Sequence, residues 1–149
     1  FINMRQFEGE KLKADVLSRA DYIIECVEFV EERSPQTVKE YNEKLKARIQ
    51  ELIGDAAVDE QRLLNEAAIY ADKIAVAEET VRLRSHISQL RTFLEADEAI
   101  GRKLDFLVQE INREANTIGS KAQDVEIAKR VISIKAEVEK IREQIQNIE

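Results

Sequence analysis

The strictest pattern in this sequence is an apolar repeat, spaced alternately by four and three residues, over residues 122–148. Its members are all β-branched: Ile127, Val131, Ile134, Val138, Ile141, Ile145 and Ile148. Such spacing places one apolar stripe along a helix that packs lengthwise on others. β-Branched residues at both core positions disfavour a simple parallel dimer. Two arrangements remain open: antiparallel packing on the first and third predicted helices of the same chain, or packing between molecules.

Apolar spacing also predicts helices over about residues 5–32 and 34–53 and no strand. We expect the chain to restart at Ser34 and Pro35, because serine is a good N-cap and proline suits the first helical position. The short segment that follows forms a turn, and Asp59 can cap the next helix.

A third helix is predicted over about residues 60–96, and its apolar stripe changes phase beside Glu78 and Glu79. A bend, or a change of neighbouring helix, would produce that shift. A fourth helix, over about residues 100–118, is expected to end at Gly119, with a capping box starting the fifth at Ser120.

These patterns predict an all-α chain of about five long antiparallel helices, arranged as an extended bundle or hairpin assembly. We expect two units, a two-helix hairpin over residues 1–58 and a helical domain over residues 59–149.

Composition supports this class of fold. Hydrophobic residues make up 44% of the 149 residues, which excludes a fully disordered chain. Charged residues make up 36%, and with a single proline they favour long helices with wet surfaces. No run approaches the ~18 apolar residues that span a bilayer, so we expect a cytoplasmic protein without a membrane partner. Cys26 lies among apolar residues and is expected to be a buried, reduced thiol.

The net charge of −7 argues against a simple polyanion-binding surface. Basic residues gather around Lys11 to Arg19 and around Arg82 to Arg91, but acidic neighbours interrupt both groups. If RNA is the partner, the contacts must come from local clusters, from another domain or through a metal ion.

The helix predicted over residues 100–118 has an unusual polar face. Its apolar residues share one arc of roughly 100°, which suffices for a core stripe. The opposite side carries directional hydrogen-bonding groups within about 80° of one another, namely Arg102, Asp105, Gln109, Arg113 and Asn116. A face with two guanidinium groups, a carboxylate and two amides is suited to holding a ligand or a partner.

The sequence contains no phosphate-binding glycine loop, nucleophile elbow, cysteine metal site or HExxH motif. A catalytic site must therefore use carboxylates, amides, basic residues and His86, the single histidine. His86 follows Glu79 and Arg82 along one helix edge and could act as acid, base or metal ligand. The alternative is a surface histidine that is hydrogen-bonded to a neighbouring carboxylate.

Glu110 and Glu114 lie one helical turn apart and could share a divalent Mg²⁺ or Mn²⁺ ion. The alternative is ordinary pairing, of Glu110 with Arg113 and of Glu114 with Lys121. Asp105 differs from both because its neighbours are Gln109 and Arg102 rather than a row of lysines.

Four basic residues of this region could bind phosphate: Arg102, Lys103, Arg113 and Lys121. Asn116 could add hydrogen bonds to phosphate or to a 2′-hydroxyl. Phe106 is predicted on the polar side, where it would stack on a base or become buried in a partner. The alternative for the whole set is an interface network between helices or subunits.

Five stretches in order along the chain carry a resemblance: MRQFEG at residues 4–9, AEETVRLRSH at 77–86, GRKLDFLVQE at 101–110, NREANTIGSK at 112–121 and EKIREQIQNIE at 139–149. They closely resemble the C-terminal domain of the YicC/YloC family of bacterial proteins. Members of that family are described as endoribonucleases, and full-length ones carry an N-terminal domain about as long as this chain. We therefore expect this chain to be the C-terminal half of such a protein.

The resemblance implies an endoribonuclease that cuts single-stranded regions of RNA with help from a divalent cation, Mg²⁺ or Mn²⁺. On that basis the expected catalytic residues are His86, Glu79, Arg82, Asp105 and Gln109. The expected RNA or phosphate ligands are Arg102, Lys103, Arg113, Asn116 and Lys121, and the expected metal ligands are Glu110 and Glu114.

The resemblance also implies a homo-oligomer, a ring-like hexamer in the full-length protein, acting on RNA rather than DNA. The rival hypothesis is an oligomerisation and scaffold module whose polar face is a protein–protein interface, with catalysis in the other domain. A third is a regulatory adaptor that binds RNA without cutting it.

Overall fold

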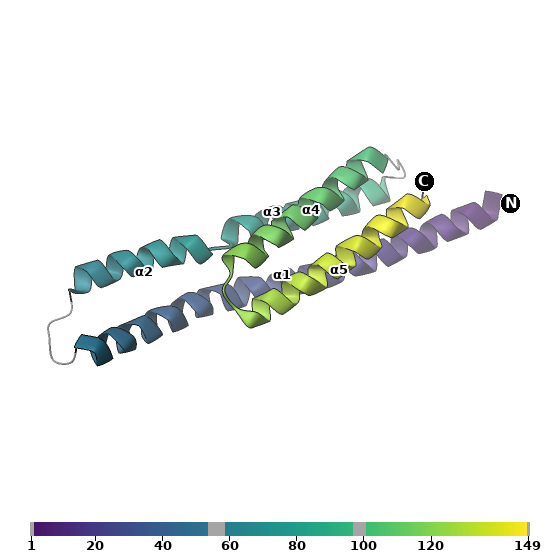
Figure 1. Ribbon diagram of the computed structural model, residues 1–149. Helices are drawn as coiled ribbons and strands as arrows, with labels where there is room; N and C mark the ends of the chain where they lie inside the picture. Colours follow the sequence, from purple (N-terminus) through teal and green to yellow (C-terminus); the bar gives the residue numbers. More distant parts are fainter. Residues whose placement is uncertain (1, 54–58, 97–100, 149) are drawn as a thin grey trace.

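The computed structural model describes residues 2–53, 59–96 and 101–148, and it describes side chains for residues 9–52, 59–96 and 101–147. In these parts of the chain it contains helices and no strand (Figure 1), which confirms the all-α prediction. The helices are α1 (Ile2–Ile53), α2 (Glu60–Ile74), α3 (Ala77–Glu95), α4 (Gly101–Lys121) and α5 (Val125–Ile148). None of the described helices is both long enough and apolar enough to cross a membrane.

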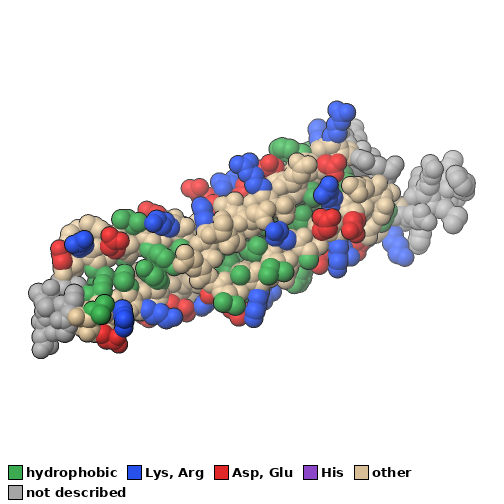
Figure 2. Space-filling model, viewed as in Figure 1, with side chains coloured by type: hydrophobic (Ala, Val, Ile, Leu, Met, Phe, Trp, Pro, Cys, Tyr) green, Lys and Arg blue, Asp and Glu red, His purple; other side chains and the backbone are tan. Residues whose placement is uncertain are grey.

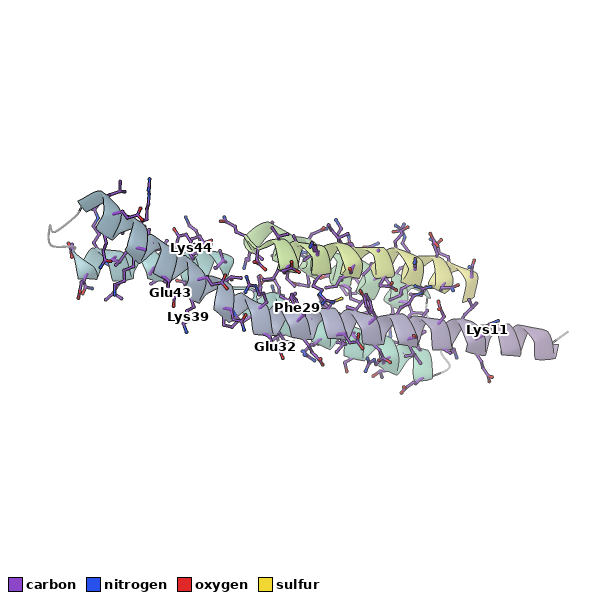
Figure 3. All side chains as sticks on the ribbon, turned by 90° about the horizontal axis from the view of Figure 1, so that it is seen from below. Lys11, Phe29, Glu32, Lys39, Glu43 and Lys44 are labelled. Carbon is purple, nitrogen blue, oxygen red and sulfur yellow. The ribbon has the colours of Figure 1, made fainter. Side chains whose placement is uncertain are left out.

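The molecule has two parts that share α1. The N-terminal half of α1 forms a bundle with α3, α4 and α5, in which α5 packs mainly on α1 and α4, while α3 packs on α1 and α4. Beyond the bundle, the C-terminal half of α1 continues as an arm, in which α2 is the one described helix that packs beside it. Figure 3 shows α1 running past the end of α5 into this arm.

The core runs along the bundle and includes the C-terminal apolar repeat. Six members of that repeat are buried within the chain: Ile127, Val131, Ile134, Val138, Ile141 and Ile145. The packing is intramolecular, on α1 as predicted but on α4 in place of the third predicted helix. Cys26 is free and fully buried as predicted, and this burial raises the pKa of its thiol. Buried residues of α1 belong to the same core as those of α3 to α5. The division of the chain into two units at residue 58 stays a prediction.

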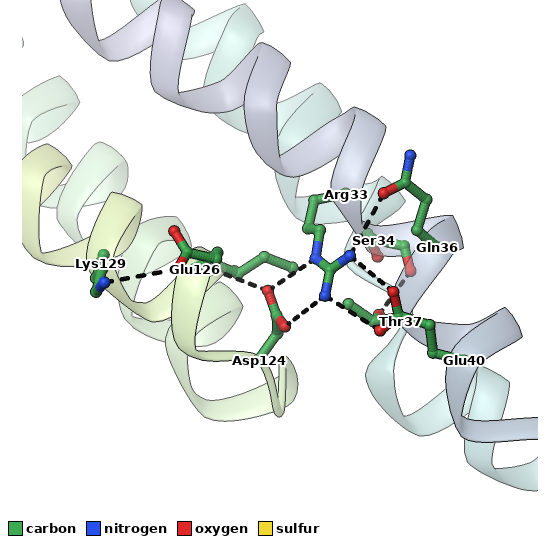
Figure 4. Close-up of polar contacts among 9 residues, drawn as sticks. Arg33, Ser34, Gln36, Thr37, Glu40, Asp124, Glu126 and Lys129 are labelled. Carbon is green, nitrogen blue, oxygen red and sulfur yellow. Dashed lines mark hydrogen bonds and ion pairs between the residues drawn. The ribbon is translucent and has the colours of Figure 1, made fainter. Parts of the chain in front are cut away.

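The predicted break at Ser34–Pro35 is wrong, because α1 continues through both residues. A proline inside a helix removes one backbone hydrogen bond and costs roughly 3 kcal/mol. Arg33, just before this position, forms two ion pairs, which Figure 4 shows. One joins it to Glu40, further along α1, at 3.0 Å, and the other to Asp124, just before α5, at 3.1 Å. Asp124 and Glu40 raise the pKa of Arg33. These contacts favour the continuous helix over a restart.

The predicted single helix over residues 60–96 is also wrong, because α2 ends at Ile74 and α3 begins at Ala77. Ala75 has an extended backbone (φ −65°, ψ 126°), and the side chain of Val76 enters the bundle core. The break lies just before the predicted phase change. The break allows the apolar stripe of α2 to face α1 within the arm, while the stripe of α3 faces the core of the bundle. Asp59 caps α2 as predicted, since its Oδ1 accepts a hydrogen bond from the Arg62 amide at 3.3 Å.

Gly119 does not end α4, contrary to the prediction, because the helix continues to Lys121. A Cβ atom at Gly119 would lie 3.2 Å from Cγ1 of Val131, so the glycine allows α4 and α5 to approach closely. The cap of α5 is Asp124 rather than Ser120, since Asp124 Oδ2 accepts a hydrogen bond from the Ile127 amide at 3.2 Å.

Candidate functional site

A row of charged and polar side chains lies between α3 and α4. Residues three, four or seven apart share one edge of a helix, and each of these antiparallel helices turns such an edge toward the other. We call these residues the α3–α4 row: Glu79, Arg82 and His86 from α3, and Glu110, Glu114 and Lys121 from α4.

Ion pairs connect the two helices along this row. Lys121 Nζ lies 2.6 Å from Glu79 Oε1, and Arg82 Nε lies 2.9 Å from Glu114 Oε1. Arg82 also approaches Glu79 Oε1 at 3.5 Å. The side chains of Glu79 and Glu114 are only 3% and 7% exposed, whereas Arg82 is about half exposed. The row therefore consists of buried carboxylates with cations that reach the surface.

The environment of Glu79 keeps this carboxylate charged. Burial alone would raise the pKa of Glu79, but the hydrogen bonds from Lys121 and from the backbone, and the charge of Arg82, hold it below its ordinary value. The hydrogen bond to Glu114 raises the pKa of Arg82. Both shifts favour the charged forms of Glu79 and Arg82.

Three buried atoms of the row have no hydrogen-bond partner among the described residues. They are Oε2 of Glu79 and both ring nitrogens of His86. A buried polar atom without a partner costs about 1–3 kcal/mol, so such atoms call for an explanation. His86 therefore does not form the hydrogen bond to a neighbouring carboxylate that the alternative interpretation required. The unpaired nitrogens are available to a ligand.

His86, Glu110 and Glu114 are arranged in a way that fits a metal ion. Each offers one ligand atom, and the three atoms lie within 4.8 Å of one another. Ligand atoms about 2.1 Å from a common ion lie roughly 3–4.2 Å apart, so a small side-chain adjustment would complete the site. Arg82 holds Glu114, and Arg113 lies 4.0 Å from Glu110, as outer partners of the carboxylates.

Two of the predicted catalytic residues of α4, Asp105 and Gln109, lie away from this row. Asp105 and Gln109 line a groove of about 190 Å³ against α5, together with Glu139 and Arg142. Arg102, Arg113 and Asn116 are exposed side chains of α4. Arg113 is 76% exposed and approaches Glu110, while Arg102 lines a shallow concavity together with residues of α3. They are neither buried in mutual pairs nor gathered around His86, and their predicted roles stay predictions.

The pairing across the row was not predicted from the sequence. Lys121 pairs with Glu79 and not with Glu114, whose partner is Arg82. The spacing of Glu110, Glu114 and Lys121 by four and seven residues was the available signal, because it places all three on one flank of the apolar stripe. Which flank faces α3 depends on the packing of α4 against both of its neighbours.

Comparison with known proteins identifies the family. The family model "Endoribonuclease YicC-like, C-terminal" matches residues 30–149. The chain belongs to this family. The match to YicC-like proteins confirms the resemblance seen in the sequence stretches and covers α2 to α5 with the C-terminal part of α1.

Two curated relatives support the assignment to the YicC-like family. "Probable endoribonuclease YicC" of Clostridioides difficile is 52% identical over 147 residues, which cover 98% of this chain and 50% of that protein. The protein of the same name from Haemophilus influenzae is 38% identical over 149 residues, covering 100% of this chain and 51% of that protein. The chain thus spans about half the length of these YicC relatives.

Proposed function

We propose that this chain is the C-terminal part of a divalent-metal-dependent endoribonuclease that cleaves single-stranded regions of RNA, with its active site in the α3–α4 row. Membership of the YicC-like family and the names of the relatives support the endoribonuclease activity. The observation that carries the site is the pair of unpaired, buried ring nitrogens of His86 beside Glu110 and Glu114.

In this proposal His86, Glu110 and Glu114 would hold the ion, and the chemistry it would supply is positive charge beside the scissile phosphate and a water molecule of lowered pKa. An imidazole together with two carboxylates suits Mn²⁺ better than Mg²⁺, which prefers oxygen ligands alone. We assign His86 to metal binding because its ligand atom and those of Glu110 and Glu114 lie within 4.8 Å of one another.

The remaining residues of the row act on the RNA itself. Arg82 is half exposed and can donate hydrogen bonds to a phosphate oxygen while still holding Glu114. Lys121 adds a second positive charge at the end of the row. Because the pKa of Glu79 is lowered, its buried, unpaired Oε2 is a charged acceptor that can hold a water molecule within the row.

The test is cleavage of an RNA with single-stranded segments by the full-length natural protein, with Mn²⁺, with Mg²⁺ and with chelator. His86→Ala and Glu114→Gln should abolish metal-dependent cutting and weaken Mn²⁺ binding measured by calorimetry. Glu126→Gln, which changes an exposed carboxylate of α5, is the matched control and should preserve both. Full cutting by His86→Ala, at unchanged oligomeric mass, would move the active site elsewhere.

The rival function, oligomerisation, is favoured by the arm. Residues of α1 and α2 line a groove of about 620 Å³ there, and Figure 2 shows hydrophobic side chains gathered between the two helices. Leu52, Leu64 and Ile69 of the arm are half exposed or more. We propose that the arm contributes to the contacts of a homo-oligomer, a hexamer in the full-length protein. Loss of oligomeric mass in Ile69→Lys, with Ile132→Lys as an exposed control in the bundle, would support this role.

A further inference from the structure

We infer that a concavity between α3 and α4, next to the His86 end of the α3–α4 row, is a subsite for one nucleotide of single-stranded RNA. Its base stacks on Phe106, and the neighbouring phosphate binds Arg102 and Lys103. The inference rests on the proposed function, because it names how the same site recognises its substrate.

The subsite continues the α3–α4 row along the same two helices. On α3, Gln89 follows His86 by one turn, and on α4, Phe106 precedes Glu110 by one turn. One turn is about 5.4 Å, so both positions can be reached by adjacent nucleotides of one strand. A concavity of about 270 Å³ opens here, lined by Gln89, Phe93, Arg102, Lys103, Phe106 and Leu107.

The aromatic residues of this concavity are in two different states. Phe93 is partly buried against the core, and the Lys103 ammonium lies 5.4 Å from its ring centroid. Phe106 is 59% exposed, and so large an apolar ring at the mouth of a groove is available for stacking. Base–aromatic stacking tolerates any base, which suits an enzyme acting on single-stranded segments.

The charges beside Phe106 complement a phosphate. Arg102 and Lys103 form no ion pair with any described residue, whereas Arg82, Arg84 and Arg91 of α3 all have carboxylate partners. Arg102 and Lys103 are adjacent in the sequence and both line the concavity, so their charges act together beside Phe106. Arginine matches phosphate geometry with its fork, and lysine adds a point charge. The amide of Gln89 can meet the edge of a stacked base.

The test uses the full-length protein and a short fluorescent single-stranded RNA in chelator, so that binding is measured without cutting. Phe106→Ala should weaken the affinity about 5- to 100-fold, and Phe106→Trp should restore it. Arg102→Ala should weaken binding and reduce the salt dependence by about one phosphate contact. Ile132→Ala, an exposed apolar residue on α5, is the matched control and should bind as the unaltered protein does.

Unchanged RNA affinity in Phe106→Ala would overturn the inference. If the oligomeric mass fell in the same variant, Phe106 would instead belong to a protein interface. Failure of the proposed function looks different: the unaltered protein would fail to cut RNA with Mn²⁺, yet binding would still depend on Phe106 and Arg102. Loss of cutting in His86→Ala, with normal RNA affinity, would support a nucleotide subsite at Phe106 that is separate from the metal site at His86.

Discussion

Arg82 of α3 donates a hydrogen bond from Nε to Oε1 of Glu114 of α4, over 2.9 Å. Glu114 is also within 4.8 Å of the ligand atoms offered by His86 and Glu110. One carboxylate therefore joins the contact between the helices to the proposed metal site. Outer partners of this kind orient a ligand and tune its affinity for the ion.

Replacing Arg82 by glutamine should weaken Mn²⁺ binding by about 10- to 100-fold, because Glu114 loses the group that orients it. Calorimetric titration with Mn²⁺ measures the effect. Arg84→Gln serves as control, since Arg84 lies on the same helix but pairs with Glu31 of α1. Equal Mn²⁺ affinities for the two variants would show that Arg82 does not support the site.

Glu79→Gln should lower the free energy of unfolding by about 1–2 kcal/mol at pH 7, because the charged pair with Lys121 is lost. The pKa of Glu79 is below its ordinary value of 4.5 in the folded protein. Its charge therefore stabilises the fold above about pH 4.5, and this contribution disappears as the pH falls through the lowered pKa. Urea unfolding of both proteins between pH 7 and pH 3 measures the difference. A difference that grows on acidification would contradict the assignment.

Gly119→Val should destabilise the protein by about 1–3 kcal/mol, because its side chain would collide with Val131 where α4 meets α5. Adding Val131→Ala should recover part of that loss. Gly9→Ala is the contrasting change, since a Cβ at Gly9 meets nothing within 4 Å inside α1 and should stabilise the helix by about 0.5–1 kcal/mol. Thermal unfolding compares the three variants. Equal effects at Gly9 and Gly119 would exclude close packing as the reason for Gly119.

Ile141→Asp should unfold or dissociate the protein, with a loss above about 3 kcal/mol, because Ile141 is buried in the core and a charge there has no partner. Circular dichroism and mass in solution report the result. Ile132→Asp, on the exposed side of α5, should leave both measurements unchanged. Normal helicity and mass in Ile141→Asp would refute the proposed importance of the repeat.

The sequence predicted the fold class well because apolar spacing reports directly on helical faces. The repeat from Ile127 to Ile145 is buried as its period requires. Local signals failed where tertiary contacts outweighed them. Pro35 lies inside α1, where Arg33 bridges to Asp124, and Gly119 serves packing against Val131 rather than helix termination.

The candidate site could be predicted only in pieces. His86 and Glu79 were grouped on one helix, and Glu110 and Glu114 on another, by periodicity alone. Periodicity does not say which flank of α4 faces α3, so Asp105 and Gln109 were grouped with the row although they line a groove against α5. The register between the helices, which sets Arg82 opposite Glu114, is a property of the packed bundle.

The continuity of α1 has a mechanical consequence. At 1.5 Å per residue, a helix of 52 residues is about 78 Å long, and its two halves belong to the bundle and to the arm. The ion pairs of Arg33 stabilise α1 where its two halves meet, next to Pro35, which removes a backbone hydrogen bond from the helix. A displacement of the arm is therefore transmitted through α1, as one rigid helix, to the core on which α3 and His86 are positioned.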